Sequence, residues 1–298
     1  MNKKGPVYKI RRKFQTIATR LFGYKVMTQV YYRIILKKRC NLSEPQTLNE
    51  KICWLKVYHY PYNDLIIQCA DKYRVREYVE KKIGAEYLVP LLGHWSSADE
   101  IDFNTLSDKF VLKCNHGSRY NLLVEDKSSL NTEEVRKQLN TWLKEDFSLF
   151  NAEPHYHTIS RKIICEKFIE NELTDYKFFC ANGKILFYYI ASGLLKQQDK
   201  TLTHYLPDDT LAPFQKPLYK NKIFEISPLL CTLKKLAETM AEDFHFVRVD
   251  FVVAGDQIYF SELTFSPSGG YNLHNPQEKF DQMGEMLDIS DLLKQGGQ

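Results

Sequence analysis

Residues 246–270 read FVRVDFVVAGDQIYFSELTFSPSGG, and this stretch decides the fold. Apolar residues alternate from Phe246 to Val253, residues 254–257 form a turn-type sequence around Gly255, and the apolar pattern resumes at Ile258. Alternation on both sides of a short turn is typical of two antiparallel strands. The stretch therefore predicts a β-hairpin.

Charged residues interrupt the apolar pattern of this hairpin. Arg248 and Asp250 share one face of the first strand because they are two residues apart, and the return strand brings Glu262 opposite them. Mg²⁺ takes oxygen ligands of this kind together with phosphate oxygens, and arginine offers a planar fork to a phosphate. The alternative is an ion-pair cluster that only stabilises the hairpin. The rest of the chain favours the phosphate site over that alternative.

The composition is that of a globular protein with a substantial core. The chain has 298 residues, 44% of them hydrophobic, and is long enough for one or two linked domains. Its seven cysteines contain no CxxC pair, which predicts reduced thiols in a cytoplasm rather than disulfides or a zinc site. The sequence contains no run of about 18 apolar residues, so no membrane span is predicted. Residues 1–30 contain no continuous apolar segment that would predict a secretory signal.

Positive charge is concentrated at the start of the chain. Twelve of the 41 Lys and Arg residues lie in residues 1–39, which contain no Asp or Glu. The remaining 29 basic and 37 acidic residues sum to −8, so a nucleic-acid partner is disfavoured. Ile10, Phe14, Ile17 and Leu21 have helical spacing among these cations. Such a helix either lies on an anionic membrane surface or packs its apolar stripe on the protein body.

The middle of the chain adds polar residues that suit a nucleotide. An apolar strand ends at Lys113 and runs into a loop with Gly117 and Ser118, whose backbone N–H groups and hydroxyl could surround phosphate oxygens. Glu166 ends another buried strand, where it could accept ribose hydroxyls, and Lys177 projects from a later strand. Residues 196–221 are expected to form a long loop, which is typical of a lid or a substrate-binding surface.

Five blocks in a fixed order resemble the ATP-grasp superfamily, and within it the TupA-like branch of teichuronopeptide biosynthesis. The blocks are LNEKICWLK, DKYRVREYVEKKIG, KFVLKCNHGS, DYKFFCANGK, and VRVDF followed by SELTFSPSGG. The resemblance implies an α+β, ATP-grasp fold in which two α+β subdomains clasp ATP between antiparallel sheets. The expected organisation is a basic, helical N-terminal region at residues 1–84 and an ATP-grasp domain at 85–298, with subdomains at 85–165 and 166–298.

The resemblance also implies an activity. The implied enzyme is an ATP- and Mg²⁺-dependent carboxylate–amine ligase that acts through an acyl phosphate. It would join an amino acid or amine to a uronic-acid-type carboxylate of a capsule or teichuronic-type polysaccharide. The expected partners are the amine, a polysaccharide or lipid-linked sugar, and an anionic membrane that residues 1–39 contact at its cytoplasmic face. The alternatives are an ATP-grasp kinase for a sugar or polyol, and a non-catalytic glycan-binding or glycosyltransferase-associated module.

The roles that the family assigns fall on thirteen residues of this sequence. Lys177 and Arg248 are the implied catalytic residues, and Asp250, Glu262 and Thr264 the implied metal ligands. The implied ATP-binding residues are Lys72, Lys113, His116, Gly117, Ser118, Glu166, Phe168, Ile169, Lys177 and Arg248. Two positions depart from the family pattern: Thr264 stands where the wider fold has asparagine, and Arg119 where the branch often has glycine.

Overall fold

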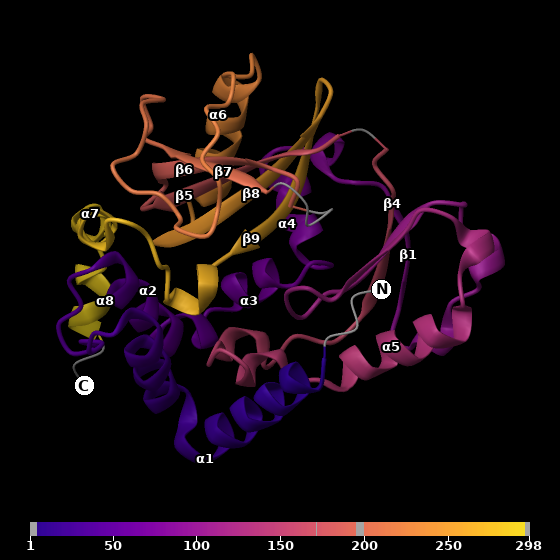
Figure 1. Ribbon diagram of the computed structural model, residues 1–298, viewed down its shortest axis with the longest axis horizontal. Coiled ribbons are helices and arrows are strands. Elements are labelled where there is room, and N and C mark those ends of the chain that lie inside the picture. Colours follow the sequence, from indigo (N-terminus) through magenta and orange to yellow (C-terminus); the bar gives the residue numbers. More distant parts are fainter. Residues whose placement is uncertain (1–4, 171, 195–199, 296–298) are drawn as a thin grey trace.

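Two antiparallel sheets make up the β part of the computed structural model, which describes residues 5–170, 172–194 and 200–295 (Figure 1). The four-stranded sheet has the order β1-β4-β2-β3 and the five-stranded sheet the order β7-β6-β5-β8-β9. The first sheet contains β1 (Leu91–Trp95), β2 (Phe110–Cys114), β3 (Asn121–Val124) and β4 (Ile163–Lys167). The second contains β5 (Thr174–Ala181), β6 (Lys184–Ser192), β7 (Thr201–Tyr205), β8 (Phe246–Ala254) and β9 (Gln257–Thr264). The expected α+β class with two antiparallel sheets is confirmed.

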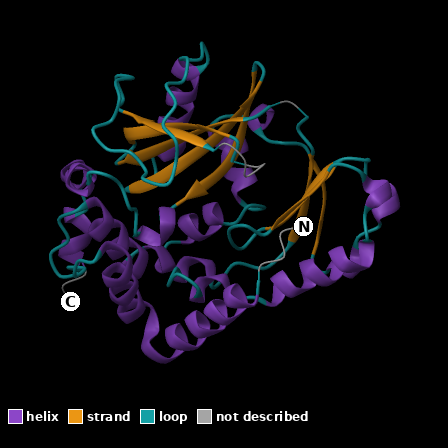
Figure 2. Cartoon of the chain, in the orientation of Figure 1, coloured by secondary structure: helices purple, strands orange, loops and turns teal. Residues whose placement is uncertain are grey.

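Helices surround both sheets, as Figure 2 shows. The α-helices are α1 (Pro6–Leu36), α2 (Leu48–Tyr58), α3 (Asp64–Ala70), α4 (Val75–Lys82), α5 (Thr132–Lys144), α6 (Leu230–Ala241), α7 (Gln277–Gln282) and α8 (Ser290–Gln295). In Figure 1, α6 covers the upper face of the five-stranded sheet, and α5 runs beside the four-stranded sheet on the right. Thr47 and Glu50 form the capping box that begins α2.

The β8–β9 hairpin has the register that the sequence predicts. Asp250 pairs with Glu262 across the hairpin, and Lys177 on β5 pairs with Asp250 from the other side. Gly255 occupies the turn with a φ of 62°, a conformation that glycine adopts without steric cost. The three strands therefore bring a lysine and two carboxylates together on neighbouring backbones.

The segment after β6 differs from the expected long loop. Residues 201–205 form the strand β7, which pairs with β6 at the edge of the sheet, and only the connection from 206 to α6 is irregular. The expected loop also includes residues 196–199, which lie outside the described residues. Sequence reasoning missed β7 because the flanking prolines and polar residues outweighed its short Thr-Leu-Thr-His-Tyr pattern.

One continuous hydrophobic core extends from Tyr32 to Ile289 and includes residues of both sheets. Helices α2, α3 and α4 contribute Ile52, Ile66 and Val79 to it, so the N-terminal helical region packs into the same core as the sheets. The division of the chain at residues 84 and 165 stays a prediction. All seven cysteines are unpaired, and six of them are buried.

Helix α1 is longer than its predicted stripe and bends at Gly23, where φ is 77°. The stripe formed by Ile10, Phe14, Ile17 and Leu21 points outward, with every side chain at least half exposed. The expectation that this stripe packs on the protein body is therefore wrong. Within the described ranges, no helix is long and apolar enough to cross a membrane.

Candidate active site

Asp250 is the centre of a buried ion-pair cluster on the five-stranded sheet. Its side chain is 0% exposed. Arg248 donates from Nε to Oδ1 at 2.7 Å and from Nη2 to Oδ2 at 2.6 Å, and Lys177 Nζ donates to Oδ2 at 2.7 Å. Lys177 Nζ also lies 3.3 Å from Asp175 Oδ1. Asp250 thus fixes both predicted catalytic cations by charge-assisted hydrogen bonds.

Glu262 is the more accessible carboxylate of the cluster, with 28% of its side chain exposed. Its Oε1 accepts from Arg248 Nη2 at 3.2 Å and from the Thr264 hydroxyl at 3.3 Å. Its Oε2 lies 3.2 Å from Lys72 Nζ. The Thr264 hydroxyl in turn accepts from Arg248 at 3.0 Å. The three predicted metal ligands therefore share one cation, Arg248.

The protonation states in this cluster follow from burial and opposing charges. Burial lowers the pKa of Lys177 and of Arg248, but the charge of Asp250 together with those of neighbouring groups outweighs it and raises both above their ordinary values. The further groups are Asp175 and Tyr189 for Lys177, and Tyr189 and Glu262 for Arg248. Burial raises the pKa of Glu262, but Lys72, Arg248 and Lys177 outweigh it and hold the value well below the usual range. At neutral pH the two cations and Glu262 are therefore charged.

Lys72 connects this cluster to the glycine loop of the other sheet. Its Nζ donates to the carbonyl of Gly117 at 2.9 Å and lies beside Glu262, while its backbone N–H donates to Asn115 O at 3.2 Å. The fully buried Asn115 side chain donates to Asp71 Oδ1 and to Ser160 O, each at 2.8 Å. Sequence reasoning missed Asn115, although an Asn between Lys113 and Gly117 was the available signal.

The loop between β2 and β3 has a buried base and an exposed tip. A Cβ on Gly117 would lie 2.6 Å from the Phe147 ring, so only glycine fits there. Ser118 and Arg119 are exposed, and Arg119 has a φ of 65°, which explains why glycine is favoured at that position. The His116 ring is buried, contacts the carbonyl of Glu145, and has a pKa that burial lowers to about 4. Its side chain therefore faces the protein interior, and only its backbone could serve a ligand.

Lys113 and Glu166 form a second charged pair, on the four-stranded sheet. Lys113 Nζ lies 2.5 Å from Glu166 Oε2, and Arg76 of α4 lies 3.5 Å from Oε1. Phe168 and Ile169 follow β4 and are half-buried. The structure thus groups Lys72, Lys177, Arg248, Asp250, Glu262 and Thr264 around the five-stranded sheet, and Lys113 with Glu166 on the other sheet. What these residues bind stays a prediction.

Lys216 is a further cation near the cluster that sequence reasoning missed. It lies in the irregular connection after β7, with Nζ 5.8 Å from the centre of the Tyr189 ring, and Tyr189 is the strand partner of Lys177. None of the described carboxylates forms an ion pair with it. Burial and the charges of Arg248 and Lys177 lower the pKa of Lys216 to about 8.

The lowered pKa of Lys216 predicts a pH-dependent stability effect. Below pH 8 both the folded and the unfolded chain carry the proton, and the folded chain bears the full free-energy cost of a half-buried charge. Between pH 8 and 10.5 the folded chain has released the proton while the unfolded chain still binds it, so the cost decreases as pH rises. Lys216→Met is expected to raise the melting temperature at pH 7 by roughly 2–4 °C, the shift for about 1 kcal/mol, and to raise it less at pH 10.

Thermal unfolding of both variants at pH 7 and pH 10 checks this prediction. Lys220→Met, in the same connection but exposed, is the matched control and should leave the melting temperature unchanged. If Lys216→Met melts at a lower temperature than the wild type at pH 7, the charged Lys216 does not destabilise the folded chain, and the prediction is wrong.

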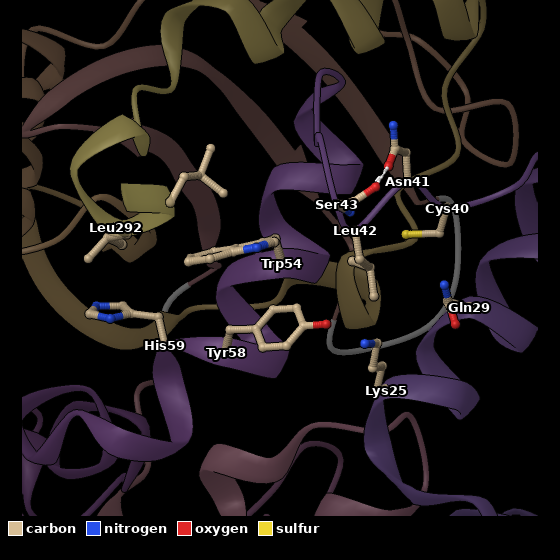
Figure 3. Close-up of a pocket in the computed structure, with 11 residues that line it drawn as sticks. Lys25, Gln29, Cys40, Asn41, Leu42, Ser43, Trp54, Tyr58, His59 and Leu292 are labelled. Atoms are coloured by element: carbon tan, nitrogen blue, oxygen red, sulfur yellow. Dashed lines mark hydrogen bonds between the residues drawn. The ribbon is translucent and has the colours of Figure 1, made fainter. Parts of the chain in front are cut away.

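A separate cavity of about 760 Å³ lies between α1, α2 and α8. Figure 3 shows Trp54 and Tyr58 side by side in it, with the Tyr58 hydroxyl directed toward Lys25 of α1. None of the residues that line it belongs to the charged cluster. We therefore place the candidate site at the charged cluster and not in this cavity.

Two antiparallel sheets, a glycine loop and two carboxylates among cations are the features that the sequence analysis expects of the ATP-grasp class. A sequence model described as TupA-like ATP-grasp matches residues 50–288, most of the chain. The chain therefore belongs to the TupA-like ATP-grasp family. No curated protein matches the chain.

Several solved structures resemble the chain at low identity. The D-alanine–D-alanine ligase from Bacillus anthracis complexed with ATP has 17% identity over 78% of this chain and 70% of that chain, with a TM-score of 0.45. The corresponding ligase from Helicobacter pylori has 14% identity over 81% and 69%, with a TM-score of 0.43. The L-amino acid ligase from Bacillus licheniformis has 13% identity over 69% and 45%, with a TM-score of 0.42.

Proposed function

We propose that the chain uses Mg²⁺ and ATP to join an amino acid or another amine to a uronic-acid-type carboxylate of a capsule or teichuronic-type polysaccharide. The amine and a polysaccharide or lipid-linked sugar would be its partners, in the cytoplasm. The seven unpaired cysteines agree with a reducing compartment. The observation that carries the proposal is the chain of contacts from the carbonyl of Gly117 through Lys72 to Glu262, Arg248 and Asp250.

The charge balance of the cluster favours a polyanionic ligand. Four cations, Lys72, Lys177, Lys216 and Arg248, lie around three acids, Asp175, Asp250 and Glu262. On the other sheet Lys113 and Arg76 share the single acid Glu166. Each group has one cation in excess, which suits the distributed negative charge of a triphosphate.

The side chains could support ligation without supplying a nucleophile. A substrate carboxylate oxygen attacks the γ-phosphorus, ADP leaves, and an amine nitrogen then attacks the acyl carbon, releases phosphate and loses a proton to water. Lys177 and Arg248 are held in place by Asp250 and would neutralise the phosphate oxygens during transfer. Lys113 would also neutralise phosphate oxygens, Glu166 would accept ribose hydroxyls, and the Gly117–Ser118 loop would cover the phosphates.

Asp250, Glu262 and Thr264 fit a magnesium ion that is shared with phosphate oxygens, because such ions commonly take only one or two carboxylates from the protein. Glu262 is reachable, and among the described residues its Oε2 contacts only Lys72. Asp250 is buried and both its oxygens already accept hydrogen bonds, so it would bind through a remaining lone pair. The ion would neutralise charge that develops on the transferred phosphoryl group.

An assay of ADP, phosphate and product mass tests the proposed function. The protein is incubated with Mg²⁺, ATP, a panel of amino acids and uronate-containing glycans. Ligation predicts ADP and phosphate only when both carboxylate and amine are present, and a product lighter than the two substrates by one water. A stable phosphorylated sugar without amine would indicate a kinase. Glycan binding without any ATP-dependent thermal shift would indicate a non-catalytic module.

A further inference from the structure

Helix α1 presents a large apolar surface to solvent. Nine of its large apolar side chains are between 38% and 73% exposed. They form what we call the α1 apolar face: Ile10, Phe14, Ile17, Leu21, Phe22, Val26, Val30, Ile34 and Ile35. Figure 1 shows α1 along the lower rim of the molecule, with no described element beyond it in that view. Large exposed apolar side chains gathered on one helix indicate an interaction site.

Polar contacts fix the helix in this orientation. Gln15, Thr19 and Thr28 lie on the buried side of α1. The Thr19 hydroxyl donates to Leu149 O at 2.8 Å, and the Tyr24 hydroxyl is 2.9 Å from Ser148 Oγ. A helix on the surface of a soluble protein normally turns its apolar side inward. The buried side of α1 also carries Ala18, Met27, Tyr32 and Leu36. The helix therefore has apolar residues on both sides, and its contacts with the protein body leave the outer set exposed.

The charges around the face indicate what covers it. Exposed basic residues on the same helix are Arg11, Lys13, Arg20, Lys25 and Arg33, and residues 1–39 contain no acid. An apolar face bordered by Lys and Arg is typical of a helix that lies in the interface of an anionic membrane. A second copy of the chain is disfavoured, because pairing two such helices would bring the seven basic residues of each copy's α1 together.

We propose that the α1 apolar face docks the protein on a membrane surface that contains anionic lipids. The apolar side chains enter the boundary between headgroups and acyl chains, and the flanking cations pair with the headgroups. The proposal rests on the exposed face and its charges and is independent of the reaction proposed above. If both hold, docking would keep the enzyme beside a lipid-linked substrate.

Vesicle co-sedimentation in the absence of ATP tests the docking. The full chain is mixed with vesicles of phosphatidylcholine alone or with phosphatidylglycerol, and the bound fraction is measured. The wild type is expected to bind the anionic vesicles and to bind less as salt rises. Leu21 is 73% exposed in the free protein and would enter the membrane on docking. Leu21→Glu is expected to weaken binding at least about tenfold, because it replaces this apolar side chain by a charge that anionic lipid repels.

Leu211→Glu is the matched control, since Leu211 is 54% exposed and lies outside α1. It should bind as the wild type does, and circular dichroism should show both variants folded. Arg11→Gln combined with Lys13→Gln should reduce binding to the anionic vesicles. Absence of wild-type binding to anionic vesicles would overturn the proposal. So would a dimer in sedimentation velocity that Leu21→Glu dissociates while vesicles bind neither protein.

Discussion

Replacing Glu262 by glutamine is expected to reduce ADP release roughly 100- to 1,000-fold, the range for losing one electrostatic contact to a transition state. Glutamine keeps the shape of the side chain but removes the negative charge that lies beside Lys72 and Arg248. Because the side chain is partly exposed, the folded state should tolerate the change. The measurement is ADP and phosphate release under saturating Mg²⁺ and ATP, together with the melting temperature.

Glu242→Gln is the matched control for this experiment. Glu242 also pairs with a lysine, Lys82, but its side chain is 60% exposed and lies outside the cluster. Its substitution should change neither turnover nor stability noticeably. Wild-type turnover in Glu262→Gln would mean that the cluster is a structural ion pair, as the alternative interpretation of the hairpin holds.

Asp250→Asn is expected to lower the free energy of unfolding by about 3–5 kcal/mol, because it leaves buried cations without their partner. Lys177 would retain only Asp175, and Arg248 only Glu262. Urea unfolding of the wild type and the variant measures the loss. The exposed pair of Asp291 with His245 offers the control: Asp291→Asn should cost less than about 1 kcal/mol.

A double-mutant cycle separates the free energy of the Asp250–Lys177 ion pair from the effect of each substitution on the shape of the site. Lys177→Met removes one cation of the pair. The double variant of Lys177→Met and Asp250→Asn should therefore lose less free energy of unfolding than the two single variants together, by about 0.5–3 kcal/mol. Strict additivity, or an Asp250→Asn variant as stable as the wild type, would show that Asp250 does not hold Lys177 in place.

The hairpin and its charges could be predicted because their geometry is local. Strand alternation and a short turn fix which side chains share a face, so Arg248, Asp250 and Glu262 were placed correctly from spacing alone. The glycine loop was predictable for the same reason, since two short strands flank it. Lys72 came only from the resemblance to a family, because nothing local shows that the segment between α3 and α4 lies against the loop at Gly117.

Contacts between distant segments could not be predicted from the sequence. Lys216 approaches Tyr189 only because β7 pairs with β6 and turns the following connection back over the sheet. The burial of His116 depends on its contact with Glu145, 29 residues away. The outward direction of the stripe on α1 depends on which side Thr19 and Tyr24 attach to the body. Periodicity shows that a helix has two faces, but not which of them is buried.

The bridge that Lys72 makes between Gly117 and Glu262 has a consequence for how a ligand enters. When Lys72, Lys177 or Arg248 turns to an incoming phosphate, it leaves a carboxylate without its counterion. Entry is therefore an exchange of partners, and it balances only for a ligand that arrives with positive charge of its own. A triphosphate without metal would take the cations and leave the carboxylates unpaired. A metal-complexed triphosphate would offer phosphate oxygens to the cations and a metal ion to the carboxylates at once.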